Sequence, residues 1–305
     1  MDNVPHVPVL LDAVLAWLAP VAGGRLVDAT FGGGGYTRAL LAHGAREVVG
    51  LDRDLDAIAR GDDLAAVEPR FRMVGARFGE LATAVDGRFD GIVFDLGMSS
   101  YQVDTPERGF SFRQDGPLDM RMGGDGPTAA DLVAELDEAE LADIFRRYGE
   151  EFKARRAARA IVARRRERPF TRTLDLADVV RGAVGGGGAV DPATRVFQAL
   201  RIAVNDELGE IERGLDGAVQ RLAPGGRLVV VSFHSLEDRI VKRFIQDESG
   251  AVVGVSRHRP PVATAPAPAR LERLTRKVVR PDAAECARNP RARSARLRAA
   301  RRREE

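Results

Sequence analysis

The chain has 305 residues, of which 44% are apolar and 30% charged, with a formal net charge of +2. At roughly 150 residues per domain, this length predicts two domains, or one domain with a large insertion. The apolar fraction excludes a disordered chain, and no stretch approaches the roughly 20 apolar residues of a membrane span. A single cysteine, Cys286, excludes an internal disulfide and a cysteine-based zinc site. No secretory signal precedes the first apolar segment, so we expect a cytoplasmic globular protein.

The small net charge conceals an uneven distribution. Residues 257–305 carry 15 cations and 5 anions, which leaves a net charge of −8 on residues 1–256. A second basic segment, 152–172, holds nine cations and one anion, Glu167. Two basic segments on an otherwise acidic chain favour a polyanionic partner such as nucleic acid. The alternative is a solvated helix face followed by an exposed tail.

The first hundred residues alternate between predicted strands and helices. Short apolar runs predict strands at 25–29, 47–52, 71–74 and 89–97. Between the first two strands, a glycine-rich loop leads into a helical segment that ends at Gly44. Strands that alternate with helices predict a parallel sheet with right-handed crossovers.

The pattern then changes from sheet to helix. Residues 98–127 form a long loop rich in glycine, serine, aspartate and proline, which is typical of a functional segment. Helical periodicity dominates 128–183 and resumes at Pro192. A strand is predicted at 228–233 after a Pro-Gly-Gly turn, and 274–281 and 295–300 are predicted as a final hairpin. The expected organisation is a discontinuous α/β domain, 1–105 with 206–305, interrupted by a helical substrate-recognition insert at 106–205.

A cofactor site is predicted at the start of the sheet. The loop 31–36 follows the first strand, and its glycines permit a close backbone approach to a ligand. Asp52 ends the second strand, where a carboxylate can accept hydrogen bonds from both ribose hydroxyls of an adenosine. This arrangement serves a nicotinamide dinucleotide and S-adenosylmethionine equally well. Asp28, just before the loop, suits a cationic ligand group better than a pyrophosphate, and the turn at 222–228 resembles that of class I methyltransferases.

The segment after the fourth strand is predicted to lie beside the ligand. Asp95 ends that strand, and ligands bind at the carboxyl ends of strands in open α/β sheets. Downstream, 108–122 is dense in glycine, arginine, aspartate and aromatics. Phe110 or Phe112 there would either stack on a base or attach the loop to the core.

The motifs of this chain resemble those of the bacterial 16S ribosomal RNA (cytosine-N4)-methyltransferase family, which modifies a cytosine in the decoding region. The resemblance rests most firmly on RGFSFRQDGPLDMRM (108–122) and SFHSLEDR (232–239). Weaker segments extend it across nearly the whole chain, in order: 6–18, 27–41, 50–54, 94–102, 193–208, 222–231, 240–244 and 289–298.

The resemblance implies a class I, Rossmann-like methyltransferase fold with a helical insert, S-adenosyl-L-methionine as methyl donor, and 16S rRNA as substrate. We expect this RNA to be within the 30S subunit, with naked 16S rRNA as the alternative that the sequence leaves open. It also implies which residues bind the donor: Gly34, Gly35 and Tyr36 in the loop, Asp52 at the ribose, Phe78 near the adenine, and Asp95 and Gln102 close to the donor. We expect no metal site, because the four histidines are scattered, and either a monomer or a homodimer.

Three residues depart from the family pattern. Tyr36 replaces a histidine, Tyr101 replaces a proline, and Asp191 replaces a histidine before Pro-Ala-Thr-Arg. Because of these changes, the sequence leaves three points open. They are whether the side chain at position 36 contacts the donor, whether the loop that carries Gln102 is ordered, and whether position 191 contacts RNA.

Asp95 is the predicted catalytic residue. The lone pair of cytosine N4 is delocalised into the ring, and a hydrogen-bond acceptor on its N–H would make that pair available. Asp115, Asp119 and His234 are alternative acceptors. Two rival functions remain from the sequence: an NAD-dependent oxidoreductase of the same fold, and a non-catalytic RNA-binding factor.

Overall fold

The computed structural model describes residues 8–185, 191–250 and 268–304. The chain divides into two compact units, unit 1 (1–97 and 208–305) and unit 2 (98–207). The sequence placed these boundaries at 105/106 and 205/206. Within the described ranges, no helix is long and apolar enough to span a membrane.

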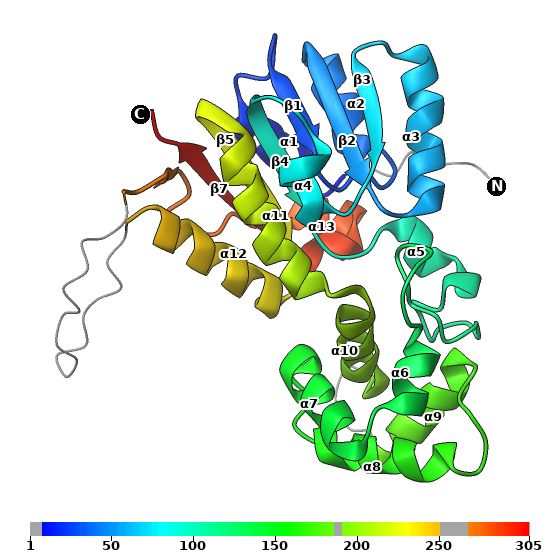
Figure 1. Ribbon diagram of the computed structural model, residues 1–305. Coiled ribbons are helices and arrows are strands. Elements are labelled where there is room, and N and C mark those ends of the chain that lie inside the picture. The colour runs from blue at the N-terminus through cyan, green and yellow to red at the C-terminus, as the bar shows by residue number, and fades with distance from the viewer. Residues whose placement is uncertain (1–7, 186–190, 251–267, 305) are drawn as a thin grey trace, which may run out of the picture. The chain divides into compact units, whose positions relative to one another are not determined.

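Unit 1 is built on a seven-stranded sheet in the order β3-β2-β1-β4-β5-β7-β6. Its strands are β1 (Arg25–Asp28), β2 (Glu47–Asp52), β3 (Phe71–Gly75), β4 (Phe89–Asp95), β5 (Leu222–Ser232), β6 (Leu271–Arg273) and β7 (Arg296–Arg302). Strands β1 to β5 run parallel to one another, and β7 runs antiparallel to both of its neighbours, β5 and β6 (Figure 1). This mixed α/β sheet, with its order reversing at β1 and β4, confirms the predicted Rossmann-like fold.

Helices cover both faces of this sheet, as Figure 1 shows. They are α1 (Leu11–Leu18), α2 (Gly35–Ala42), α3 (Leu55–Val67), α4 (Leu81–Ala84), α11 (Glu207–Arg221), α12 (Ser235–Glu248) and α13 (Ala283–Arg288). Alternate strand residues enter two separate cores. On β4, Val93 joins the core beneath α1 and α2, whereas Ile92 and Phe94 join the core beneath α11 and α12. Burial on both faces explains why the strands read as continuous apolar runs.

The end of the sheet differs from the sequence prediction at two places. The Pro-Gly-Gly segment lies inside β5, where the pairing with β4 shifts register between Phe89 and Gly91. Strand β6 forms at 271–273 rather than 274–281, and only Val279 of the predicted strand bridges to β7. Strand β6 ends before Thr275 because the side chain of this residue replaces its backbone in the pairing. The buried hydroxyl oxygen of Thr275 accepts the N–H of Ala299 on β7 at 3.0 Å, where a regular strand would offer a backbone carbonyl.

Unit 2 is helical. Its elements are α5 (Ser100–Asp104), η2 (Pro106–Arg108), α6 (Ala129–Glu135), α7 (Glu138–Gly149), α8 (Ala154–Arg165), α9 (Thr173–Val184) and α10 (Ala193–Asn205). Residues such as Leu141, Phe145, Ile161 and Leu200 form a core of its own. The 128–149 segment forms two helices because Asp137 accepts the N–H of Glu140 at 2.8 Å and caps the second.

Candidate active site

Three aspartates end three neighbouring strands of unit 1. Asp28 ends β1, Asp52 ends β2 and Asp95 ends β4, and β1 pairs with both of the others in parallel. Because parallel strands end at the same edge of a sheet, the three carboxylates gather there. This edge includes the point where the strand order reverses, where ligands of such sheets bind.

The glycine-rich loop is anchored to this edge by its backbone. Gly32 donates its N–H to Asp52 Oδ2 at 2.8 Å, and the guanidinium of Arg38 donates to the carbonyl of Gly33 at 2.7 Å. Gly34 caps α2 with φ +73°, and a Cβ at this position would lie 2.7 Å from the Phe31 ring. Glycine is therefore required here by both the backbone angle and the space.

The environment of the three aspartates disfavours their negative charges. Burial raises the pKa of Asp28 to about 6. Hydrogen bonds, such as the one that Thr37 Oγ1 donates at 2.8 Å, lower this pKa but do not outweigh the burial. Burial also raises the pKa of Asp52. The pKa of Asp95 lies well above its ordinary value because of burial first, and then because of the charges of Asp28 and Glu237. A cationic ligand at this edge would compensate all of these charges.

Asp95 has an oxygen that the described residues leave without a hydrogen-bond partner. Its backbone N–H donates to Thr30 Oγ1 at 2.7 Å, which fixes the strand end. Its Oδ1 is buried yet has no partner among the described residues, although the residue as a whole is only partly buried. A buried acceptor without a partner carries a desolvation cost, which a ligand donor would relieve.

Phe78 supplies an aromatic ring just after β3. It begins η1 (Phe78–Glu80), is partly buried, and meets Phe94 edge to face with 5.8 Å between ring centroids. Glu210 Oε2 accepts the N–H of Gly79 at 2.9 Å and so holds this turn.

Tyr36 uses its side chain to hold the N-terminal segment. The ring is 3% exposed within the core under α1 and α2, and its hydroxyl donates to the carbonyl of Val9. Burial raises the pKa of this hydroxyl well above its ordinary value. Gly35, next to it, faces Pro8, whose Cγ would lie 2.4 Å from an added Cβ. The side chain of Tyr36 is thus engaged with Val9.

Gln102 belongs to unit 2, where it caps a helix. Its Oε1 accepts the N–H of Ser99 at 3.0 Å, and its own N–H donates to Ser99 Oγ at 3.3 Å. The side chain is buried, whereas Tyr101 beside it is 43% exposed. The donor contact expected of Gln102 therefore stays a prediction.

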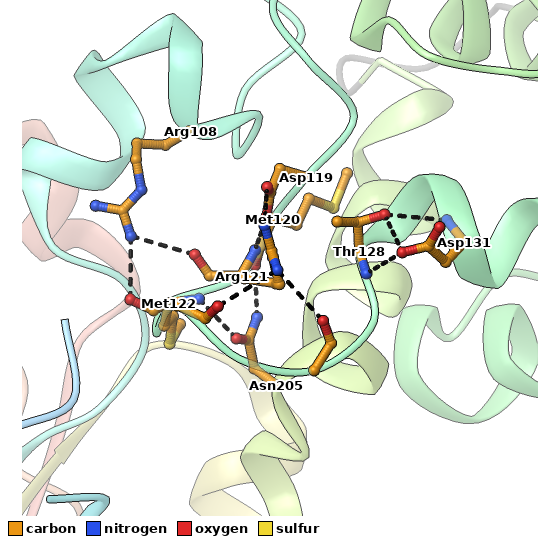
Figure 2. Close-up of polar contacts among 10 residues, drawn as sticks. Arg108, Asp119, Met120, Arg121, Met122, Thr128, Asp131 and Asn205 are labelled. Carbon is orange, nitrogen blue, oxygen red and sulfur yellow. Dashed lines mark hydrogen bonds and ion pairs between the residues drawn. The ribbon is translucent and has the colours of Figure 1, made fainter. Parts of the chain in front are cut away.

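The loop 108–122 is held within unit 2 by polar contacts (Figure 2). Asn205 donates to the carbonyl of Met120 at 2.7 Å and accepts the N–H of Met122 at 2.8 Å, and Arg108 donates to the carbonyl of Met122 at 3.0 Å. Phe110 is buried, and Phe112 packs on Phe197 with 4.7 Å between ring centroids. Phe112 therefore attaches the loop to the helical core, as in the second of the two alternatives.

Asp115 and Asp119, two of the other candidate acceptors, have ion-pair partners within unit 2. Arg172 donates to Asp115 at 2.8 Å, and Arg121 donates to Asp119 at 2.8 Å, which lowers the pKa of both carboxyls despite the partial burial of Asp119. In unit 1, Nε2 of His234 lies 3.1 Å from Glu237 Oε1. His234 is the N-cap residue of α12.

Several cations of the basic segments are used inside the fold. Arg165 donates to the carbonyl of Leu136 at 2.6 Å, and Arg164 is paired with Asp175. In the tail, Arg298 donates to Asp238 at 2.7 Å and its side chain is only 13% exposed. Only part of the predicted basic surface therefore faces solvent.

Glu237 is a buried residue of this region that the sequence analysis missed. Its Oε2 accepts the N–H of Phe233 at 2.7 Å and that of His234 at 3.1 Å. The signal was available in the sequence, because a glutamate three residues after a helix N-cap is the capping-box pattern.

Comparison with known proteins shows the family of this chain. The model of the MraW methylase family matches residues 3–303. A protein of Caulobacter vibrioides named ribosomal RNA small subunit methyltransferase H is 56% identical over 98% of this chain and 96% of its own length. A protein of the same name from Rhodospirillum centenum is 60% identical over 97% of this chain and 92% of its own length. A crystal structure of an rRNA methylase from Streptococcus thermophilus aligns with a TM-score of 0.43 and 11% identity, over 98% of this chain and 99% of that one. With a family match over nearly its whole length, the chain belongs to the MraW methylase family.

Proposed function

We propose that this protein transfers a methyl group from S-adenosyl-L-methionine to the exocyclic N4 of a cytosine in the decoding region of 16S rRNA. Membership of a methylase family and the names of the 54–60% identical relatives support an rRNA methyltransferase. The observation that carries the proposal at the site is Asp95 at the carboxyl end of β4, whose buried Oδ1 has no hydrogen-bond partner among the residues that the structure describes.

The residues at the sheet edge fit this donor. The carboxylate of Asp52 accepts the backbone N–H groups of Gly32, Asp54 and Arg53, and its two oxygens offer about four acceptor sites, so acceptor capacity remains for a ribose hydroxyl. Gly34 and Gly35 let the loop pack closely against Phe31 and Pro8 at the edge where the donor would bind, and Phe78 offers a ring for the adenine. The buried charges of Asp28 and Asp95 match a ligand with a sulfonium and an ammonium group. When bound, the donor supplies an electrophilic methyl group.

The chain's own task is then to position the nucleophile and exclude water. Asp95 accepts a hydrogen bond from the N4 amino group, which draws the nitrogen lone pair out of conjugation, and it takes up the N4 proton that must leave when the bond to the methyl group forms. The positive charge that a bound donor would bring to this edge favours the ionised carboxylate of Asp95, which is the form able to accept the hydrogen bond. The side chains of Ser99 and Ser100 are candidates to assist.

The RNA substrate is expected to lie against the exposed cations of the two basic segments, where phosphate contacts give salt-dependent affinity. The target cytosine must leave its stack to reach the donor, which favours a flexible or single-stranded site in the 30S subunit. We also propose that the protein acts in the cytoplasm, where that substrate is found.

The proposal is tested with radiolabelled S-adenosyl-L-methionine and 30S particles that lack the modification, followed by mapping of the labelled nucleotide. Label on cytosine N4 of the decoding region is expected. Label on another atom would overturn the site of methylation, and no label would favour a non-catalytic RNA-binding factor. Thermal protection by NAD instead of the donor would favour the oxidoreductase.

Asp95→Asn separates the chemical role of Asp95 from donor binding. At saturating donor, turnover is expected to fall at least 100-fold, the scale of a positioned proton acceptor, while donor affinity measured by calorimetry changes less. Turnover equal to that of the unaltered protein would show that Asp95 is not the acceptor.

A further inference from the structure

Unit 2 exposes one aromatic ring almost completely. Phe152 lies in the turn between α7 and α8 and is 92% exposed, more than the other exposed large apolar residues of the described chain, Leu55, Val67, Met98 and Tyr101. The guanidinium of Arg195 from α10 lies 5.3 Å from its ring centroid. The ring is therefore supported by a cation yet open to a flat partner.

This ring stands at a groove between α7 and α8. The groove has a volume of about 820 Å³, and its lining includes the small side chains of Ala139, Ala142 and Ala154. Such a volume lies within the range of sites that hold small molecules, about 300–1,000 Å³. An apolar lining of alanines beside an open aromatic ring leaves room for a planar group.

The carboxylates that line this groove are neutralised within unit 2. Asp143 pairs with Arg146 at 2.7 Å and with Arg147 at 3.1 Å, and Glu138 lies 3.4 Å from Arg159. Glu151 lies 3.9 Å from the guanidinium of Arg195 and also accepts the backbone N–H of Lys153 at 2.8 Å. The groove therefore offers no free acidic group that would attract a cationic partner.

Two arginines beside Phe152 have no such compensation. Arg155 and Arg156 are exposed and line the groove, and the described chain places no carboxylate within ion-pair distance of either. Both lie in the first turn of α8, where the helix dipole disfavours cations, and that turn holds no acidic residue. Arg155 also repels Arg159 one turn later. The placement is unfavourable in the free protein and becomes favourable only with an anion.

We propose that this groove binds a single-stranded segment of the RNA substrate, with a base stacked on Phe152 and phosphates on Arg155 and Arg156. An open ring next to uncompensated guanidinium groups is the combination that binds single strands, because every base has a face to stack and every nucleotide has a phosphate. The inference rests on the proposed RNA substrate and assigns to unit 2 a contact that is separate from the methyl-transfer chemistry.

Variants of the full chain test the two parts of the groove separately. Phe152→Leu keeps an apolar side chain of similar bulk but removes the aromatic face, and Phe152→Trp keeps the face. Binding of a fluorescein-labelled 12-nucleotide single-stranded RNA is measured by anisotropy between 50 and 200 mM NaCl. We expect Phe152→Leu to weaken binding about ten-fold, the scale of one stacked base, without changing the salt slope, and Phe152→Trp to bind like the unaltered protein.

Charge reversal tests the phosphate contacts. Arg155→Glu and Arg156→Glu are each expected to weaken binding and to reduce the salt slope by about 0.7, the share of one phosphate on a single strand. Arg243→Glu is the matched control, because Arg243 lies on α12 of unit 1 and its side chain is 84% exposed. Thermal melting and donor binding are expected to stay unchanged in all variants, which verifies that each one is folded.

Several results would overturn the inference. One is that Phe152→Leu binds the RNA as tightly as the unaltered protein, and another is that Arg243→Glu loses as much RNA affinity as the groove variants. The inference is also overturned if the duplexed oligonucleotide binds as tightly as the single strand, or if a poly-glutamate peptide displaces the RNA. Methyl transfer to 30S particles distinguishes the two proposals. Transfer without any effect of the groove variants removes the groove site alone, whereas groove-dependent RNA binding without transfer removes the proposed reaction alone.

Discussion

At the scale of single residues, the buried carboxyl of Asp28 lowers the stability of the protein without a ligand, and a cationic ligand would remove that cost. Its carboxyl is fully buried under the glycine-rich loop, and its pKa is raised to about 6. The folded protein thus holds a proton on Asp28 at a pH where the unfolded chain has released it. The stability gained from this bound proton is present below the pKa of Asp28 in the unfolded chain, and it is lost as the pH rises through the pKa of Asp28 in the folded protein.

Asp28→Asn is therefore expected to stabilise the donor-free protein at pH 7. The asparagine oxygen still accepts the hydroxyl of Thr37, and the shift of about two units corresponds to a gain of order 3 kcal/mol at most. The gain should shrink as the pH falls from 7 to 4. Urea unfolding of both proteins at several pH values measures it, and a gain that does not vary with pH would contradict the assignment. Donor affinity should fall in the same variant, because a negative charge is lost.

Gly34 offers a second test at this scale, with a matched control in the same unit. Gly23 and Gly34 have almost the same φ, +74° and +73°, but an added Cβ has open space at Gly23 and meets the Phe31 ring at Gly34. Gly23→Ala should cost about 1–2 kcal/mol from the backbone angle alone. Gly34→Ala should cost a further 1–3 kcal/mol through overpacking. Chemical unfolding compares the two, and equal costs would show that the loop adapts to the added methyl group.

At the scale of elements, the helices of unit 2 begin at sequence-encoded caps. Asp137 and Glu140 form a reciprocal capping box at α7, with both hydrogen bonds at 2.8 Å. Asp137→Ala is expected to destabilise the unit by about 1 kcal/mol, whereas Asp137→Asn keeps an acceptor and should cost much less. Hydrogen exchange of the first turn of α7 measures both. Equal protection in the two variants would show that tertiary packing alone holds that turn.

Local sequence patterns predicted the positions of helices and strands better than the contacts that these elements make with one another. The strands β1 to β4 and the helices of unit 2 follow from apolar runs and helical periodicity. Strand β6 was misplaced because Thr275 takes over a ladder position through its side chain, which no local pattern encodes. Among the cations of α8, Arg164 and Arg165 turn inward to acceptors on α9 and on the α6–α7 connection, so the basic face is smaller than the composition indicated.

At the scale of the whole molecule, the described residues form three apolar cores, one on each face of the unit 1 sheet and one among the helices of unit 2. Unit 2 is one continuous segment with its own apolar cluster, which includes Leu141 and Phe145. We expect a fragment of residues 98–207 to fold alone into a helical, cooperatively melting domain, because its core is complete. Circular dichroism and thermal melting measure this, with Leu141→Asp as the control that abolishes the transition. A fragment without a cooperative transition would show that this core depends on unit 1.

The sequence by itself determined the α/β fold, the glycine-rich loop and the three aspartates at the strand ends, because strand and loop patterns are local and parallel strands bring their ends together. Tertiary structure alone decided where the longer side chains go. It directs Tyr36 to Val9, packs Phe112 on Phe197, pairs Arg298 with Asp238 and leaves Phe152 open to solvent. A long side chain can reach many neighbours, and only the packing of segments distant in sequence selects among them.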